Sequence, residues 1–214
     1  MRKSIFKTLA ATLLLPLLCL GGAGLLSSCS EQDDEGEYDN WRERNEAYID
    51  SIARLARANA DGSWAMYKAF DLGDSLDLNG DNNYYIYVRA REEGSGTYRP
   101  LYNDSVRVHY SGRLIPTTAY PAGYNFGKSF NGDVLNESVD VPSLMSVKGN
   151  VVGFATALMH MRQGERCQVI IPYYLGYGTT SNTSGNIPAY STLIFDVQLA
   201  RIYRRGIDTD TSWW

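Results

Sequence analysis

The sequence predicts an α+β fold, in which an antiparallel sheet folds over one short helix and a longer helix precedes the sheet. The strands are indicated by segments rich in β-branched and aromatic residues, most clearly residues 192–202 (TLIFDVQLARI). Apolar side chains occupy every second position there from Leu193 onward, with Asp196 and Gln198 between them. The short helix is indicated by residues 153–161 (GFATALMHM), which are rich in alanine and methionine.

The remaining strands have a similar composition. In residues 105–114 (SVRVHYSGRL), Val106 and Val108 alternate with Arg107, as expected for a strand that is buried on one face. Two further segments complete the expected sheet: residues 84–90 (YYIYVRA) and 166–172 (RCQVIIP). Several antiparallel strands with one short helix predict a sheet folded over that helix.

A longer helix is predicted over residues 40–59. Asn40 is expected to cap its start, with Glu43 completing a capping box, and Asp61-Gly62 to end it. Its apolar stripe recurs at steps of three and four residues: Trp41, Asn45, Tyr48, Ile52, Leu55 and Ala56. We expect this stripe to pack on the following domain, with a dimer seam as the alternative.

The N-terminus has the plan of a secretory signal: basic residues, then an apolar run that Pro16 and a glycine cluster interrupt. Residues 26–29 (LSSC) resemble a bacterial lipobox, so Cys29 is expected to be lipidated and to begin the mature protein. The alternative is an ordinary signal peptide with an incidental cysteine. Cys19 would leave with the signal, and Cys167 alone can form no internal disulfide. We expect Cys167 to be a buried, small apolar residue.

The charge balance argues against nucleic acid as a partner. The chain carries 20 basic and 24 acidic side chains. Without the three basic residues of the signal, the basic count falls to 17 and the net charge becomes −7. Residues 30–39 (SEQDDEGEYD) are acidic and predict a solvated tether. A similar acidic run after the lipidated cysteine is an export signal in some surface lipoproteins of the Bacteroidetes.

Five motifs follow one another in a recognisable order: VHYSG at 108–112, SFNG at 129–132, GFATALMHMRQGE at 153–165, IPYYLGYG at 171–178 and IPAYSTLIFDVQL at 187–199. Together they resemble the FKBP family of peptidyl-prolyl cis-trans isomerases. Members of that family show VHYTG, a Phe-Asp pair, a Val-Ile-x-Gly-Trp run opening a helix, a Tyr-Gly before a loop, and Ile-Pro followed by Thr-Leu-x-Phe-Asp-Val-x-Leu. The resemblance covers roughly residues 83–203.

The resemblance implies a five- to six-stranded antiparallel sheet around a short helix, with an apolar bowl between them as the active site. It also implies a role for each of nine residues. Expected as catalytic are Tyr110 and Phe130 in one wall, Asn131 beside them, Tyr177 with its hydroxyl at the rim, and Phe195 at the back. Expected to bind substrate are Phe154 at the floor, Val151 or Val152 at the Val-Ile position, and Ile187 on an overhanging loop.

Two departures from the family pattern bear on the rate. Asn131 stands where the family usually has a carboxylate, and Phe154 stands where it usually has tryptophan. The hairpin after Tyr110 is also enlarged. From periodicity alone, Phe195, Tyr110 and Phe154 would be interpreted as core residues.

The resemblance implies that the protein isomerises X-Pro bonds of exported proteins. No cofactor or metal is expected, and His109 and His160 lie inside structural motifs. Expected partners are proline-containing polypeptides, a bacterial membrane through lipid on Cys29, and macrolide inhibitors. Two alternatives stay open: a slow or inactive peptide-binding, chaperone-like relative, and a cell-surface lipoprotein that binds glycan or a partner protein.

The expected organisation has five parts. They are a signal peptide at 1–28, an acidic tether at 29–39, a helix and linker at 40–82, the isomerase domain at 83–203, and a tail at 204–214. The expected location is the cell envelope.

Overall fold

A computed structural model of the chain describes residues 36–73 and 80–204. The signal peptide, Cys29, most of the acidic tether and nearly all of the predicted tail lie outside these residues. No helix within the described ranges is long and apolar enough to cross a membrane.

The described residues form an antiparallel sheet with two α-helices. The strands run in the order β1-β2-β6-β7-β3-β4, and β5 also pairs with β3. Their bounds are Trp64–Lys68 (β1), Tyr85–Glu92 (β2), Ser105–Arg113 (β3), Asn125–Lys128 (β4), Ser143–Ser146 (β5), Arg166–Ile171 (β6) and Leu193–Tyr203 (β7). The α-helices are α1 (Trp41–Ala58) and α2 (Val152–His160), and short 3-10 turns are η1 (Asn82–Tyr84), η2 (Val147–Gly149), η3 (Tyr173–Leu175) and η4 (Thr183–Gly185). The predicted α+β class is confirmed.

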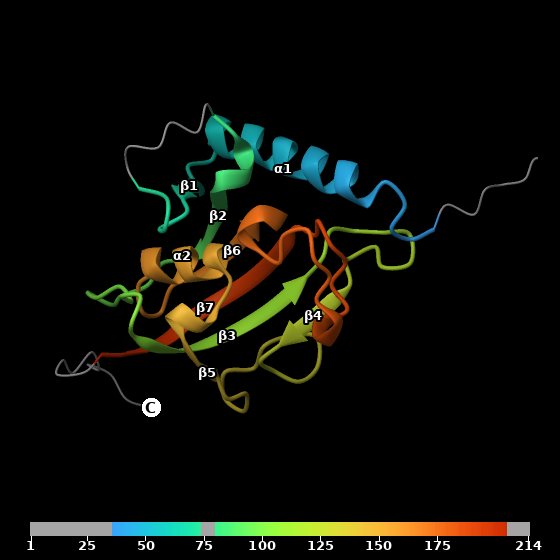
Figure 1. Ribbon diagram of the computed structural model, residues 1–214. Helices are drawn as coiled ribbons and strands as arrows, with labels where there is room; N and C mark the ends of the chain where they lie inside the picture. Colours follow the sequence, from blue (N-terminus) through green and yellow to red (C-terminus); the bar gives the residue numbers. More distant parts are fainter. Residues whose placement is uncertain (1–35, 74–79, 205–214) are drawn as a thin grey trace, which may run out of the picture. The chain divides into compact units, whose positions relative to one another are not determined.

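The sheet curves around α2, which is buried along most of its length (Figure 1). The helix follows the η2 turn and ends at His160, within one residue of the predicted bounds at each end. Gly153 lets its first turn lie against the end of β6, since a Cβ at this position would sit 2.3 Å from Ile171 Cγ2. The side chains of α2 therefore fill the concave side of the sheet, as predicted for the short helix.

The longer helix α1 forms where it was predicted, but its ends and its buried stripe differ. Asn40 lies at the N-cap in a left-handed conformation with φ 50°, and its side chain makes no capping bond, so the predicted capping box is wrong. At the other end, Asn59 adopts the left-handed conformation and donates its N–H to Leu55 O. Leu55 itself is exposed, whereas Ile49 is buried. The buried side is Trp41, Asn45, Ile49, Ile52, Ala53 and Ala56.

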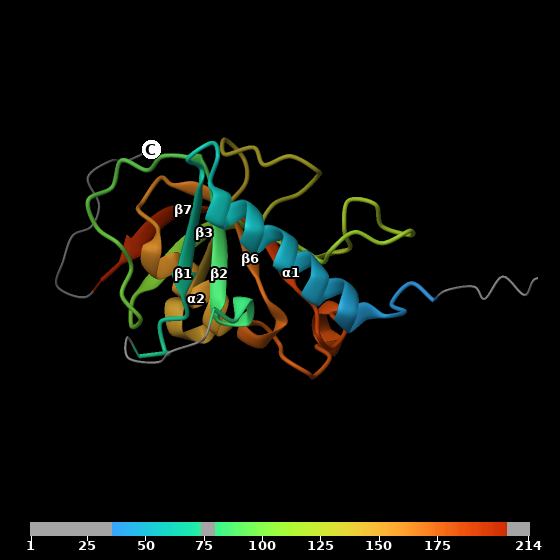
Figure 2. The same cartoon turned by 90° about the horizontal axis from the view of Figure 1, so that it is seen from above.

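The predicted linker at 40–82 contains a strand that the sequence reading missed. β1 pairs with β2 along its whole length, from Trp64 opposite Arg89 to Lys68 opposite Tyr85. The sheet thus continues across the predicted boundary near residue 83, and α1 packs on β1 and β2 (Figure 2). The described residues belong to one compact unit, and the independent folding of residues 83–203 stays a prediction.

Candidate active site

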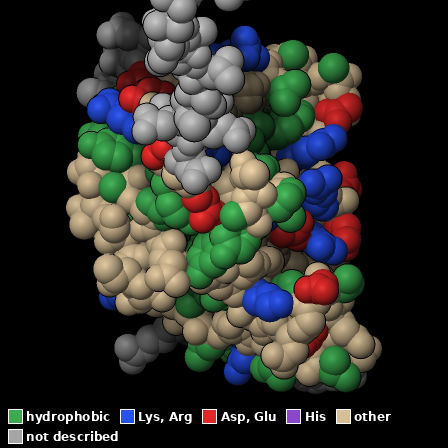
Figure 3. Space-filling model, turned by 90° about the vertical axis from the view of Figure 1, so that its right-hand side faces the viewer, with side chains coloured by type: hydrophobic (Ala, Val, Ile, Leu, Met, Phe, Trp, Pro, Cys, Tyr) green, Lys and Arg blue, Asp and Glu red, His purple; other side chains and the backbone are tan. Residues whose placement is uncertain are grey.

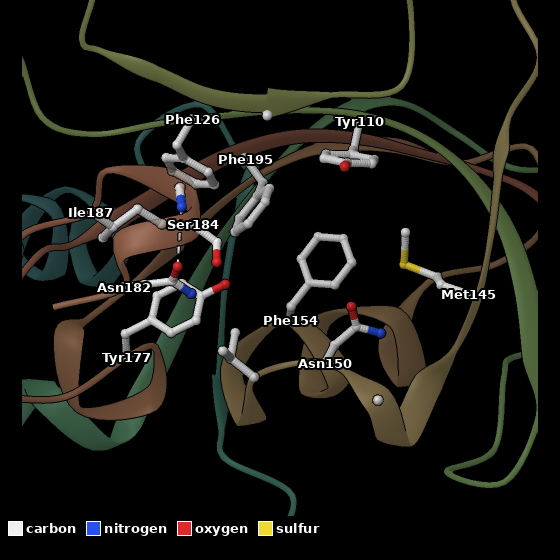
Figure 4. A pocket seen from close by; sticks show the side chains of 14 residues that line it. Tyr110, Phe126, Met145, Asn150, Phe154, Tyr177, Asn182, Ser184, Ile187 and Phe195 are labelled. Atoms are coloured by element: carbon white, nitrogen blue, oxygen red, sulfur yellow. Dashed lines mark hydrogen bonds between the residues drawn. The ribbon is translucent and has the colours of Figure 1, made fainter. Parts of the chain in front are cut away.

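A cavity of about 380 Å³ opens between the start of α2, the strands β3, β4 and β7, and the loop before β7 (Figure 4). Its lining is mainly apolar and aromatic. The apolar and aromatic side chains around it are Tyr110, Phe126, Met145, Val151, Phe154, Tyr177, Ile187 and Phe195. Neutral polar residues complete it, namely Asn150, Asn182 and Ser184, with three glycines.

Phe195 lies at the centre of the aromatic group. Strand alternation in β7 turns this side chain to the concave face, where it is only 8% exposed. Its ring centroid lies 4.6 Å from that of Phe154, 5.4 Å from that of Phe126 and 6.4 Å from that of Tyr110. The contact with Phe126 is edge-to-face, an arrangement that aromatic pairs favour. The four rings therefore form a connected, packed surface.

Gly112 in β3 makes this ring packing possible. A Cβ at this position would lie 2.4 Å from Phe126 Cε2 and 2.8 Å from Phe195 Cε1. Any side chain there would push the two rings apart or expel one of them. The glycine of the VHYSG motif is thus required by the back of the cavity.

The rim is formed by Tyr177 and by the loop that follows it. Tyr177 is 40% exposed, and its hydroxyl points into the cavity (Figure 4). Among the described residues this hydroxyl has no hydrogen-bond partner, so it is available as a donor to a ligand. In the loop that follows, a two-way backbone bridge joins Asn182 and Ile187 (2.8 and 2.9 Å), and Asn182 Oδ1 accepts from Gly185 N at 3.1 Å.

Among the described residues, no acidic, basic or histidine side chain lines this cavity. His160 stacks on Tyr67, and His109 lines a different hollow; burial lowers the pKa of both imidazoles. Cys167 is buried as predicted, and burial raises the pKa of its thiol. No cluster of potential metal ligands occurs within residues 36–73 and 80–204.

The structure brings together six of the nine predicted site residues. They are Tyr110, Val151, Phe154, Tyr177, Ile187 and Phe195. Val152, the alternative to Val151, does not line the cavity. The catalytic and binding roles of all six remain predictions.

Phe130 and Asn131 lie elsewhere, which corrects the expected wall. Phe130 lines a second hollow of about 270 Å³ with His109, and this hollow shares only Tyr110 with the lining given above for the cavity. Asn131 is exposed. Phe126 occupies the wall instead, and the residue after it is Gly127. The family's carboxylate position after the wall phenylalanine is therefore occupied by Gly127. It is not occupied by Asn131, as the SFNG motif had suggested.

The sequence contained a signal for Phe126, although it is weak. It is the other phenylalanine between VHYSG and the α2 motif, and like Phe130 it is followed by a residue other than aspartate. Only the pairing of Gly112 with Gly127 in β3 and β4 fixes which ring faces the bowl. Met145 and Asn150 lie in segments of irregular pattern and gave no signal.

Comparisons with known proteins agree with this geometry. The family model described as FKBP-type peptidyl-prolyl cis-trans isomerase matches residues 96–200. FK506-binding protein 1A of Neurospora crassa is 32% identical over 117 residues, which cover 55% of this chain and 88% of that protein. The chain belongs to the FKBP-type peptidyl-prolyl cis-trans isomerase family.

Other FKBP relatives are similar over part of their length. The macrophage infectivity potentiator of Trypanosoma cruzi is 37% identical over 113 residues, and the FKBP-type 22 kDa isomerase of Escherichia coli is 32% identical over 117. Each match covers about half of this chain, at 53% and 55%, and 50% of the relative. A crystal structure of a peptidyl-prolyl cis-trans isomerase from Pseudomonas syringae superposes with a TM-score of 0.50 at 20% identity, over 76% of this chain and 96% of that one. That likeness supports the FKBP fold.

Proposed function

We propose that this protein is a peptidyl-prolyl cis-trans isomerase whose catalytic site is the aromatic cavity. Membership of the FKBP-type family supports the reaction class. The observation that carries the proposal is the four-ring surface of Tyr110, Phe126, Phe154 and Phe195. At the rim above it lies a tyrosine hydroxyl that has no hydrogen-bond partner among the described residues. The chain spans only about half the length of two of these relatives, so its substrate and partners are part of the proposal.

The reaction needs no acid, base or nucleophile. Rotation about an X-Pro amide faces a barrier of about 20 kcal/mol, because the C–N bond has partial double-bond character. A twisted amide loses resonance, so its carbonyl becomes less polar and its nitrogen pyramidal. An apolar surface accommodates this state better than the planar amide, and such differential binding lowers the barrier.

Two parts of the cavity have separate roles in this scheme. The prolyl ring would lie on Phe154 and Phe195, which exclude water from the amide. Tyr177 would donate its hydroxyl to a carbonyl of the substrate at the rim, which fixes the peptide while the amide turns. A cavity of about 380 Å³ has room for proline and part of a neighbouring residue.

One observation favours the alternative of a slow, peptide-binding relative. In the family pattern, a carboxylate follows the wall phenylalanine, and here Gly127 follows Phe126. A Cβ at Gly127 would lie 3.8 Å from Tyr110 Cε2 and from the Tyr110 hydroxyl oxygen, in ordinary contact. A carboxylate therefore fits at this position without displacing the wall.

The isomerase assay and one substitution separate the two possibilities. The purified chain is mixed with an Ala-Leu-Pro-Phe peptide, and the rate of cis-to-trans conversion is compared with the uncatalysed rate. We expect clear acceleration by the wild type and a further increase in Gly127→Asp, with Asn131→Asp unchanged as the matched control. If neither wild type nor Gly127→Asp accelerates the reaction while the peptide still binds, the peptide-binding alternative replaces the enzyme.

The same cavity is the proposed site for macrolide inhibitors. One relative is named for binding FK506, and the apolar lining suits a large apolar ligand. Inhibition of the isomerase rate by FK506, lost in a Phe126→Ala variant, is the expected result.

We also propose that the protein works in the cell envelope, anchored through lipid on Cys29, on proline-containing exported proteins. The LSSC motif and the acidic run after it support this location. Replacement of Cys29 by serine should release the protein from the membrane fraction and leave the signal uncleaved. Unchanged fractionation and unchanged mature mass would reject the anchor.

A further inference from the structure

Two loops contact the start of α1, and the second of them lines the cavity. We call them the mouth loops: residues 114–124, which join β3 to β4, and residues 179–192, which lead into β7. The second carries Asn182, Ser184 and Ile187 into the cavity lining. Figure 3 turns the right-hand side of Figure 1 toward the viewer; hydrophobic side chains lie there among Lys, Arg, Asp and Glu side chains, and no histidine is seen on this face.

Two buried side chains of α1 bind the end of the second mouth loop. Trp41 Nε1 donates to Ser191 Oγ at 2.9 Å, and Thr192 N donates to Asn45 Oδ1 at 2.7 Å. Trp41 is 6% exposed and Asn45 is fully buried. Ser191 Oγ in turn donates to Pro188 O at 2.7 Å, one residue from Ile187. The helix thus fixes the segment between Ile187 and the first residues of β7.

The first mouth loop is held by the same end of the helix. Arg44 Nη2 donates to Pro116 O at 3.2 Å, and Thr117 Oγ1 donates to Glu37 Oε1 at 2.9 Å. The two loops also touch each other, because Asn186 Nδ2 donates to the Tyr124 hydroxyl at 3.2 Å. The start of α1 and the two loops therefore form a closed set of contacts around the mouth.

The second mouth loop holds two backbone conformations that need such support. Asn186 has φ 51° and Tyr190 has φ 63°, in the left-handed region that side chains other than glycine seldom adopt. The Tyr190 ring contacts two elements. The Arg42 guanidinium of α1 lies 5.1 Å from its centroid, and Tyr173 of η3 makes an edge-to-face contact with it. Strained backbone persists only where surrounding contacts fix it.

We infer that α1 positions the active site, with Trp41 and Asn45 as the residues that hold the Ile187 loop over the cavity. Neither side chain lines the cavity, so each acts through the loop. The inference rests on the proposed isomerase function for its kinetic consequence. A loss of the bond between Thr192 N–H and Asn45 Oδ1 would leave both atoms unpaired in the folded state, so the loop would shift or open.

The test compares two ends of the same helix in the full chain. Asn45→Ala removes the contact with Thr192. Ile52→Ala removes a buried side chain of similar size from the half of α1 whose Arg57 and Asp50 bind Asn82 instead. Both should lower the unfolding temperature. At a temperature well below both transitions, we expect Asn45→Ala to lose kcat/KM about fivefold, mostly through KM, and Ile52→Ala less than twofold.

Amide hydrogen exchange gives a readout that does not depend on activity. We expect faster exchange at Thr192 and Ile187 in Asn45→Ala, and wild-type exchange there in Ile52→Ala. If Asn45→Ala does not fold, Trp41→Phe and Ser191→Ala take its place. Both remove the bond between Trp41 and Ser191, and Ser191→Ala also removes the bond from Ser191 to Pro188. The effects of the two substitutions on kcat/KM should therefore not add: the double variant should lose no more than Ser191→Ala alone.

Equal kinetic losses at the two ends of the helix would overturn the inference, as would additive effects of Trp41→Phe and Ser191→Ala. An inactive wild type would instead overturn the proposed isomerase function. In that case the same variants are compared by their affinity for the proline peptide. Weaker binding in Asn45→Ala alone would then support the positioning role, and equal binding in both variants would overturn it.

Discussion

The floor of the cavity and its rim are built in different ways. Phe154 and Phe195 stand on α2 and on β7, where helix and strand geometry direct them into the core. Tyr177 and Ile187 stand on irregular segments, and the loop that carries Ile187 is bound to α1 by hydrogen bonds that span 150 and 147 residues of the chain. The floor therefore depends on the sheet as a whole, whereas the rim depends on a few long-range polar contacts.

This difference predicts that floor substitutions cost stability and activity together, while rim substitutions cost activity alone. The largest effect is expected for Phe195→Ala. The ring is 8% exposed and contacts three other rings, so the cavity left behind should lower the free energy of unfolding by about 3–5 kcal/mol. Urea unfolding followed by tryptophan fluorescence measures this loss. A loss below about 1 kcal/mol would show that the floor is not packed as described.

The wall gives a matched pair of phenylalanines, one inside the bowl and one outside it. Phe126→Ala removes an edge contact to Phe195 and should lower kcat/KM about tenfold. Phe130→Ala removes a ring that lines the other hollow, and less than a twofold change is expected. Peptide isomerisation rates for both variants show which of the two phenylalanines forms the wall of the cavity. A larger loss in Phe130→Ala would restore the wall expected from the SFNG motif.

At the rim, Tyr177→Phe removes one hydroxyl and keeps the ring. We expect kcat/KM to fall about two- to tenfold, as a hydrogen bond of about 0.5–1.5 kcal/mol supplies, with the unfolding temperature unchanged. Unaltered kinetics would mean that the hydroxyl does not contact the substrate.

The smallest effect concerns pH and stability. Burial lowers the pKa of His109 and of His160 in the folded protein. Below a pH of about 6.5 the unfolded chain therefore binds more protons than the folded protein does. The contribution of these histidines to stability is complete above the unfolded pKa of about 6.5 and is lost as the pH falls below it. His109→Gln should make the unfolding free energy less dependent on pH between about 6.5 and 5. An unchanged slope would contradict this role of burial.

The same contrast explains what the sequence predicted well. Alternation in residues 105–114 and 192–202 placed Tyr110 and Phe195 on strands, and composition placed Phe154 on the short helix. Those are local patterns with a direct structural meaning, and the bounds of β3, β7 and α2 differ from the predictions by one residue at most. The family motifs then supplied the site that these rings share.

The errors occurred where structure depends on distant contacts. The choice between Phe126 and Phe130 depends on the register of β3 with β4, which is irregular near Gly112. Likewise β1 is five residues long and only partly buried, so its place beside β2 could not be read from local pattern. Asn45 was expected on the apolar stripe of α1, but its bond to Thr192 spans 147 residues and has no local signature.

The central claim is that an uncharged aromatic bowl performs the isomerisation without acid or base. The most direct test is the pH dependence of kcat/KM for an Ala-Leu-Pro-Phe peptide, measured on the wild type in the range where carboxylates and imidazoles titrate, about pH 4.5 to 8. Because the cavity lining formed by the described residues contains no acidic, basic or histidine side chain, the account predicts an accelerated rate that stays constant across the range in which the protein remains folded. A bell-shaped or sigmoidal profile in folded protein, or no acceleration at any pH, would contradict it.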